Sequence, residues 1–177
     1  VKEIEQASLR ISDLIKSVKT YTHMDRATDK MEANIHEGID STLTMLNHKL
    51  KQKNIQIKKE YQEGLPQILI FVSEINQVWT NLIDNAIDAM DNQGILTIRT
   101  RTEHNDLRVD IIDNGSGIPP DIQSSIFDPF FTTKAVGQGS GLGLDIVQKI
   151  VEQHKGTISV KSEPGMTQFT LCFPLRE

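Results

Sequence analysis

The sequence predicts an α+β fold, a two-layer sandwich in which helices cover one face of a mixed, largely antiparallel sheet. Helix-like segments, with apolar residues three and four positions apart, are interspersed with short alternating runs typical of strands. The last two strand-like runs, 157–162 and 167–173, are separated by Glu163, Pro164 and Gly165, which favours a hairpin. Because each layer must bury its apolar side against another, we expect the helices on a single face of this sheet.

The expected elements alternate along the chain and are bounded by turn residues. Helices are expected at 35–50, 73–91, 119–126 and 144–155. Strands are expected at 55–61, 68–72, 95–102, 107–113, 157–162 and 167–173. Ser73 is the expected N-cap of the second helix, and Gly94 and Gly156 follow the ends of two helices. Residues 127–143 have no regular pattern and are expected to form a loop rich in Phe and Gly.

A long helix is expected in front of this domain. Its apolar residues form a heptad stripe, with steps of three and four between Ile4, Ala7, Ile11, Leu14, Val18 and Tyr21. One narrow stripe cannot bury itself, so the helix either pairs with another in a coiled coil or bundle, or packs on its own domain. Because the chain starts in mid-pattern and without Met, we expect it to be part of a longer protein.

Composition excludes several functional classes. The chain has 177 residues, 37% hydrophobic and 24% charged, with a net charge of −5, and it contains no dense stripe of Lys or Arg. We therefore expect no nucleic-acid partner. No apolar run approaches the ~20 residues of a membrane span. The single cysteine, Cys172, fits a reducing compartment, so we expect a cytoplasmic location, whether the whole protein is soluble or membrane-anchored.

The helix at 73–91 contains the first group of residues with chemical potential. Asn81 and Asn85 are four positions apart, so their carboxamides lie on one stripe, beside an apolar face. Two amides at such a position suit a metal ion and phosphate oxygens, because amide oxygens are ligands for hard cations. An ordinary polar helix edge is the alternative.

A second group follows the strand at 107–113. Asp113 lies at the end of this strand, and Gly115 and Gly117 allow positive φ angles and close approach of the backbone to a ligand. A carboxylate in this position can accept a hydrogen bond from an exocyclic amine. A simple turn is the alternative.

The loop at 127–143 contains the remaining groups. Gly137, Gly139, Gly141 and Gly143 open the helix that begins at Leu144, and backbone amides at such a junction form an anion site suited to phosphates. No strand immediately precedes them, so a dinucleotide-binding motif is excluded. The aromatic residues at 127–131 predict a lid, and Lys134 is placed to meet a phosphate, although a flexible loop with a surface lysine remains the alternative.

In this order, the four motifs resemble the N, G1, F and G2 boxes of sensor histidine kinases. That family shares its ATP-binding superfamily with gyrases, mismatch-repair ATPases and a heat-shock chaperone. The resemblance extends from about Ile35 to Leu175. It implies the Bergerat ATP-binding fold, ATP and Mg²⁺ as cofactors, and transfer of the γ-phosphoryl group to a histidine.

The resemblance also implies a role for each matching residue. Asn85 matches the Mg²⁺ ligand and Asn81 its partner one turn earlier, and with Lys134 they are the expected catalytic residues. Asp113 matches the aspartate that accepts a hydrogen bond from the adenine amine. Thr167 matches a threonine near the adenine, although Met166 replaces the usual glycine. The remaining nucleotide contacts are expected from Asp88, which resembles nitrogen-sensor kinases, and from Gly115, Gly117, Ile118, Phe127, Phe130, Phe131, Gly139, Ser140, Gly141, Leu142, Gly143 and Leu144.

Two domains follow from the resemblance: residues 1–31 as the second helix of a dimerisation and histidine-phosphotransfer bundle, and residues 32–177 as the ATP-binding catalytic domain. None of the five histidines has the acceptor pattern of a histidine, an acidic residue and a later proline. His23 and His36 are expected not to be acceptors, and His48, His104 and His154 are expected at the surface. The implied partners are ATP, a response-regulator receiver domain and a second copy of the full-length protein, paired through the bundle.

Three alternatives remain open at this point. The chain could be an ATP-hydrolysing conformational clamp, a nucleotide-binding scaffold without kinase activity, or a serine kinase of the anti-sigma-factor type, which lacks bundle helices. The heptad stripe argues against the last. Hydrolysing relatives carry Glu at the position of Asn81, and an amide cannot take a proton from water, which favours a kinase.

Overall fold

The computed structural model of the chain describes residues 29–135 and 139–175. The predicted heptad helix lies outside the described residues, as do His23 and Gly137. Met31, the last residue of the predicted N-terminal domain, is the first residue of strand β1 (Met31–Ala33).

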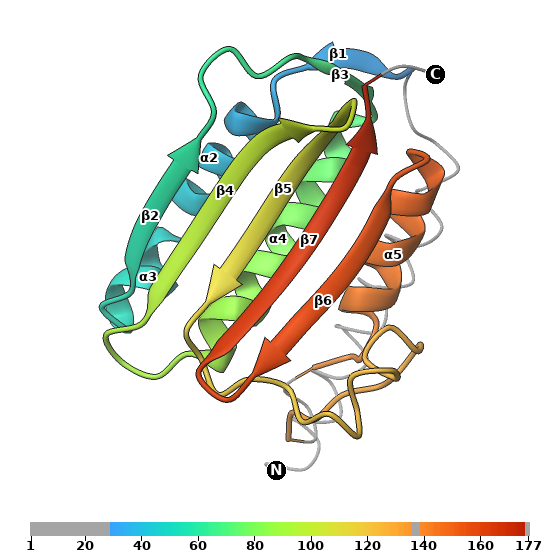
Figure 1. The fold of residues 1–177 in the computed structure, drawn as a ribbon. Helices are drawn as coiled ribbons and strands as arrows, with labels where there is room; N and C mark the ends of the chain where they lie inside the picture. The colour runs from blue at the N-terminus through green and yellow to red at the C-terminus, as the bar shows by residue number, and fades with distance from the viewer. Residues whose placement is uncertain (1–28, 136–138, 176–177) are drawn as a thin grey trace, which may run out of the picture.

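The described residues form the predicted two-layer sandwich (Figure 1). The main sheet has five strands in the order β2 (Gln56–Tyr61), β4 (Ile95–Glu103), β5 (Asp106–Asp113), β7 (Met166–Pro174) and β6 (Thr157–Glu163). Strands β2 and β4 are parallel, and the other neighbours are antiparallel. Strand β1 pairs with β3 (Ile68–Ile70) in a separate two-stranded sheet. The mixed, largely antiparallel sheet is thereby confirmed.

Helices α2 (Ile35–Met45), α3 (Asn47–Gln52), α4 (Val72–Ala89) and α5 (Gly143–Gln153) lie on the same face of the main sheet. Alternate strand residues point toward them, including Leu107, Val109 and Ile111 of β5, which are all at most 1% exposed. The fully buried side of α4 includes Trp79 and Leu82. Each such side chain contributes roughly 1.5–3 kcal/mol of burial free energy, so α4 is the central support of the layer.

None of the described helices has the length and apolar character that a membrane crossing requires.

The predicted helix at 35–50 is interrupted. Helix α2 ends at Met45 and α3 begins at Asn47, because Leu46 adopts φ −88° and ψ 3°. The hydroxyls of Thr42 and Thr44 donate to the carbonyls of Gly38 and Asp40, and such back-bonding bends helices. The change of direction keeps Leu50 buried in the core.

Two boundaries around α4 differ from the prediction. Strand β3 ends at Ile70, two residues early, and α4 begins at Val72, so the prediction of Ser73 as N-cap was wrong. Phe71 occupies the cap position without a side-chain hydrogen bond. Strand β1 was not predicted, because three residues with mixed polarity give no periodic signal.

The predicted short helix at 119–126 is a series of turns. Its backbone hydrogen bonds join residues three apart, such as Ile122 N–H to the carbonyl of Pro119 and Ser125 N–H to that of Ile122. Hydrogen bonds between residues three apart are typical of turns, whereas an α-helix joins residues four apart.

His154 was wrongly predicted at the surface, since it is only 6% exposed. Its Nε2 accepts a hydrogen bond from the backbone N–H of Phe71, at 3.0 Å, and its Nδ1–H donates to the carbonyl of Ile150. Burial lowers the pKa of His154, which suits this neutral tautomer. The residue connects the end of α5 to the start of α4. His48 and His104 are exposed, as predicted.

Candidate functional site

The C-terminal half of α4 presents the two asparagines on one side, as predicted. Asn81 and Asn85 are both half-buried. A Cβ atom added to Gly143, the first residue of α5, would lie 3.6 Å from Oδ1 of Asn81, so the start of α5 lies directly against this side chain. The Nδ2 atom of Asn81 is buried and has no hydrogen-bond partner among the described residues. A buried amide donor without a partner costs roughly 1–3 kcal/mol, which is typical of a group that meets a ligand.

Lys134 connects the segment at 127–135 to the same helix. Its Nζ atom lies 3.5 Å from Oδ1 of Asn85 and forms an ion pair with the carboxylate of Asp88. Asn85 and Asp88 are three residues apart on α4, so one ammonium group reaches both. The structure therefore brings together three of the predicted site residues from segments more than 45 positions apart in sequence.

Asp113 terminates strand β5 beside the C-terminal end of α4. The backbone N–H of Gly115 donates to its Oδ1 at 2.9 Å, and the N–H of Ser116 donates to the carbonyl of Ala89 at 3.1 Å. A Cβ atom on Gly115 would overlap the Ala89 carbonyl, so this position requires glycine for close approach. The loop after β5 is thus fixed to the helix that contains Asn81 and Asn85.

Burial raises the pKa of Asp113 to about 6, and the hydrogen bond from Gly115 opposes this shift only in part. The side chain is 4% exposed. A buried carboxylate with one protein donor retains acceptor capacity for a further N–H group. The role of Asp113 in binding an exocyclic amine stays a prediction.

Thr167 of β7 is the Cα partner of Asp113 in the sheet. Its Oγ1 lies 2.9 Å from the hydroxyl of Ser162, which also accepts a hydrogen bond from the N–H of Ile118 at 2.8 Å. Gly117 has φ +79°, and a Cβ atom there would collide with the carbonyl of Glu163. The loop at 115–118 therefore packs on the β6–β7 hairpin.

Ser162 and Gln123 were not predicted as parts of this site. The Gln123 amide donates to the carbonyls of Ile118 and Ser162, at 2.7 and 3.1 Å. Neither residue belongs to a recognisable motif. The inward position of Ser162 in its alternating strand was the one signal present in the sequence.

The aromatic loop residues differ in how they are held. The ring of Phe127 packs edge-on against Phe169, with centroids 6.4 Å apart, and Phe131 is half-buried against the core. Phe130 is 66% exposed and has φ +66°. Gly141, at φ +69°, approaches the backbone of Phe130 so closely that a Cβ atom would collide with it. The aromatic segment and the glycine segment are therefore in direct contact at Phe130 and Gly141.

Residues 139–142 lead into α5. Gly139 lies over Lys134, because an added Cβ would be 3.1 Å from its Cδ. The N–H of Leu142 donates to the Ser140 hydroxyl at 3.3 Å. Leu142 is the N-cap residue of α5 and makes no side-chain cap, so the backbone amides at this helix start are available to an anion. Gly143 and Leu144 are the first residues of α5.

Among the described residues, no group of three or more His, Cys, Asp or Glu side chains could hold a metal ion. Two oxygen groups here suit a hard cation, the amide oxygen of Asn85 and the carboxylate of the neighbouring Asp88. The Lys134 ammonium at these two oxygens is a cation in the same position. The oxygens are of the chemical type that Mg²⁺ prefers, but they supply only part of its coordination shell.

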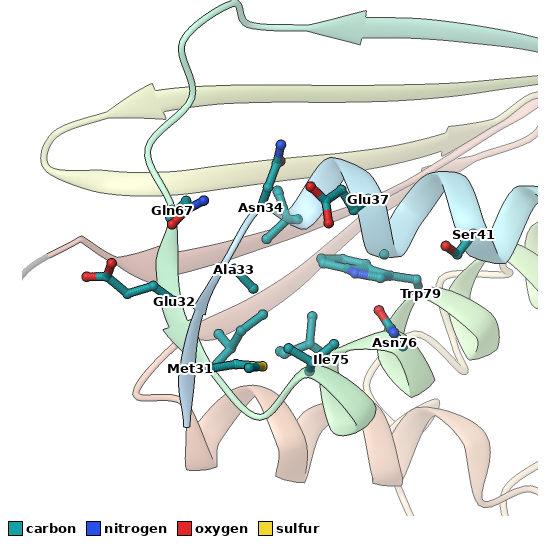
Figure 2. Close-up of a pocket in the computed structure, with 14 residues that line it drawn as sticks. Met31, Glu32, Ala33, Asn34, Glu37, Ser41, Gln67, Ile75, Asn76 and Trp79 are labelled. Atoms are coloured by element: carbon teal, nitrogen blue, oxygen red, sulfur yellow. The ribbon is translucent and has the colours of Figure 1, made fainter. Parts of the chain in front are cut away.

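A separate hollow of about 400 Å³ lies beside the N-terminal half of α4 (Figure 2). It is bounded by β1, α2 and α4 and includes Asn34, Glu37, Asn76 and Trp79. None of the predicted site residues lines it. We place the functional site at the C-terminal half of α4 instead, because the unpartnered amide, the buried carboxylate and the lysine converge there.

Comparison with known proteins identifies the family of the chain. The family described as "Histidine kinase-, DNA gyrase B-, and HSP90-like ATPase" matches residues 72–177. The sensory histidine kinase/phosphatase NtrB of Vibrio alginolyticus is 36% identical over 82% of this chain and 44% of its own length. The sensor histidine kinase ZraS of Escherichia coli is 34% identical over 98% of this chain and 36% of its own length. The chain thus spans less than half the length of these curated relatives.

The solved structures include the catalytic domain of histidine kinase ThkA, which is 32% identical with a TM-score of 0.76. The match covers 83% of this chain and 96% of that domain. The chain therefore belongs to the family of histidine kinase-, DNA gyrase B- and HSP90-like ATPases, as a catalytic domain of the sensor histidine kinase type.

Proposed function

We propose that this chain binds Mg·ATP and transfers its γ-phosphoryl group to a histidine in two-component signalling. The observation that carries the proposal is the convergence of Asn81, Asn85, Lys134 and Asp113 at one end of α4, through the contacts described above. The nucleotide lies between the end of α4, the end of β5 and the loop at 127–143.

The base end of this site is formed by Asp113 and the loop that follows it. The Asp113 carboxylate accepts a hydrogen bond from the exocyclic amine of adenine, and such a charge-assisted bond is worth roughly 1.5–3 kcal/mol. Gly115 and Gly117 keep the backbone close to the base, with Ile118 as an apolar contact. Thr167 and Ser162 hold this loop in place through the bond to Ile118 N–H.

The phosphate end of the site is formed by Lys134 and the start of α5. The backbone amides at 139–144 and the Lys134 ammonium bind phosphate oxygens, while Asn85 and the phosphates hold Mg²⁺. The metal ion supplies neutralisation of charge on the transferred group. Phosphoryl transfer requires mainly such positioning and neutralisation, and little covalent chemistry from the protein.

Asn81 determines the fate of the phosphoryl group in this proposal. Its carboxamide cannot act as a general base toward water, so hydrolysis is slow and the γ-phosphoryl group is kept for the acceptor. This property favours a kinase over a hydrolysing clamp.

We propose that none of the five histidines of this chain is the phosphoryl acceptor, which lies on a separate segment or chain. His36 is stacked on Tyr61, with centroids 4.1 Å apart, and lies 2.8 Å from the Thr100 hydroxyl, while His154 is buried. His104 lies at the opposite end of β5 from Asp113. Residues 1–31 belong to the dimerisation bundle in this proposal, and residues 32–177 form the catalytic domain.

The remaining partners follow from the relatives. One solved structure, 27% identical to this chain with a TM-score of 0.76, contains ThkA in complex with the response regulator protein TrrA. We propose a response-regulator receiver domain as the next phosphoryl acceptor, a homodimer through the bundle, and a cytoplasmic site of action, where ATP is present.

The proposal is tested by incubating the chain with γ-labelled Mg·ATP and the histidine-containing dimerisation domain of a related kinase. The expected product is a phosphate on that domain that is stable to base and labile to acid. Steady release of inorganic phosphate without labelled protein would instead indicate a clamp. ATP binding with neither product would indicate a scaffold.

A further inference from the structure

The Lys134 ammonium occupies a defined position between two oxygens of α4. Its Nζ atom lies 3.5 Å from Oδ1 of Asn85 and forms an ion pair with Oδ2 of Asp88. The side chains of Lys134 and Asp88 are 33% and 38% exposed, so both remain accessible to solvent ions.

A divalent cation needs the same oxygen. In the proposed function, on which this inference rests, Asn85 holds Mg²⁺. Two cations within a few ångströms of each other repel, and the repulsion from a divalent ion is twice that from a monovalent one at the same distance. The ammonium and the metal ion therefore cannot share the position.

We propose that Asn85 and Asp88 form one cation position, which the Lys134 ammonium occupies in the absence of a divalent cation and from which Mg²⁺ displaces it, with or without a nucleotide. Asp88 is then a positioning residue with two successive partners. It holds Lys134 beside the helix first, and it supplies negative charge near the metal afterwards. Displaced by the metal, Lys134 is free to contact the phosphates.

A comparable ion pair joins α3 to α4 and involves neither Asn85 nor Lys134. Lys49 lies 2.6 Å from Oδ1 of Asp84, and their side chains are 50% and 33% exposed. Among the described residues, Lys49 donates a hydrogen bond to the Asp84 carboxylate and none to an asparagine oxygen. Lys49 therefore reports general effects of salt on exposed ion pairs, and Lys134 reports the proposed exchange.

The exchange is measured by the rate of acylation of lysine amines, quantified residue by residue by mass spectrometry on the nucleotide-free chain. Excess Mg²⁺ is compared with NaCl of equal ionic strength. Because exposed ion pairs are worth up to ~1 kcal/mol, we expect Mg²⁺ to raise the labelling of Lys134 roughly two- to fivefold and to leave Lys49 unchanged.

Two substitutions complete the test. In Asp88→Asn, Lys134 labelling is expected to be high without Mg²⁺ and insensitive to it, while Asp84→Asn raises labelling of Lys49 alone. Unchanged Lys134 labelling with Mg²⁺ in the parent chain would overturn the inference, as would a Mg²⁺ response retained in Asp88→Asn. Because no nucleotide is present, this result is independent of whether ATP binding and histidine phosphorylation are later found.

Discussion

Strand β5 contains two buried aspartates, three residues apart, whose surroundings are opposite. Asp110 is 0% exposed and accepts hydrogen bonds from Arg101, Thr170 and Gln168, with Arg108 3.4 Å away. Asp113 is 4% exposed, and Gly115 N–H is its donor among the described hydrogen bonds. Burial by itself raises the pKa of an aspartate. At Asp113 burial prevails and the pKa is raised, whereas at Asp110 the hydrogen bonds and the two arginines outweigh burial, so the pKa is lowered.

Two threonines of the neighbouring strand β7 differ in whether they bond to the aspartate beside them. Asp110 is paired with Thr170 and Asp113 with Thr167 in the register of β5 and β7. Thr170 donates to Asp110 at 2.7 Å, whereas Thr167 bonds to Ser162 and leaves Asp113 to other donors. A buried carboxylate that the protein satisfies stabilises the sheet, and one that the protein leaves undersatisfied is prepared for a ligand.

The largest expected difference between the two aspartates concerns nucleotide affinity. Replacing Asp113 by Asn is expected to weaken ATP binding about a hundredfold, because the charge-assisted bond to the adenine amine is lost. Titration calorimetry with ATP measures this, and circular dichroism checks that the fold is retained. Unchanged ATP affinity in Asp113→Asn would contradict the adenine assignment.

Asp110→Asn is the matched substitution and has the reverse outcome. It is expected to lower the free energy of unfolding by about 2 kcal/mol, because two arginines lose a buried counter-charge, while ATP affinity stays within about twofold. Urea unfolding followed by the fluorescence of buried Trp79 measures the loss. A stable Asp110→Asn protein with impaired ATP binding would remove the distinction between the two residues.

The pH dependence of stability separates them further. Unfolded aspartate has a pKa near 3.9, so the raised pKa of Asp113 favours folding at low pH, and this contribution is lost as pH rises through about 6. Asp110, with its lowered pKa, has the opposite sign, because its contribution is present above pH 4 and lost as pH falls through its folded pKa.

Consequently, the unfolding free energy of Asp113→Asn relative to the parent chain is expected to fall by about 2 kcal/mol between pH 7.5 and pH 4. Urea unfolding at several pH values measures this difference. A difference that stays constant with pH would show that Asp113 has an ordinary pKa.

The smallest expected effects concern the two threonines. Thr170→Val is expected to lower the unfolding free energy by about 1 kcal/mol, without an effect on ATP, because Asp110 loses one donor. Thr167→Val is expected to weaken ATP binding about fivefold, because Ser162 loses a partner and the loop at Ile118 is held less firmly. The same unfolding and calorimetric measurements apply, and equal effects of both substitutions would refute the assignment of separate roles.

Local sequence patterns predicted the residues that now lie together, but not the way they are connected. The spacing of Asn81 and Asn85 placed both on one side of a helix, as observed in α4. Nothing in the sequence relates Lys134 to Asp88, or Ser116 N–H to the Ala89 carbonyl, because these contacts join loops to a distant helix end. The burial of His154 was missed for the same reason, since it depends on contact between the end of α5 and the start of α4.

By itself, the sequence determined the class of fold, the order of the main elements and the chemical types at the site, because periodicity and glycine placement act through local backbone geometry. Tertiary structure alone decided which aspartate is satisfied and which is not. Asp110 and Asp113 are identical residues in the same strand, and their pKa values are set by side chains that other strands bring near them. Such long-range neighbours leave no periodic trace in the chain, so the environment of a carboxylate appears only when the sheet has formed.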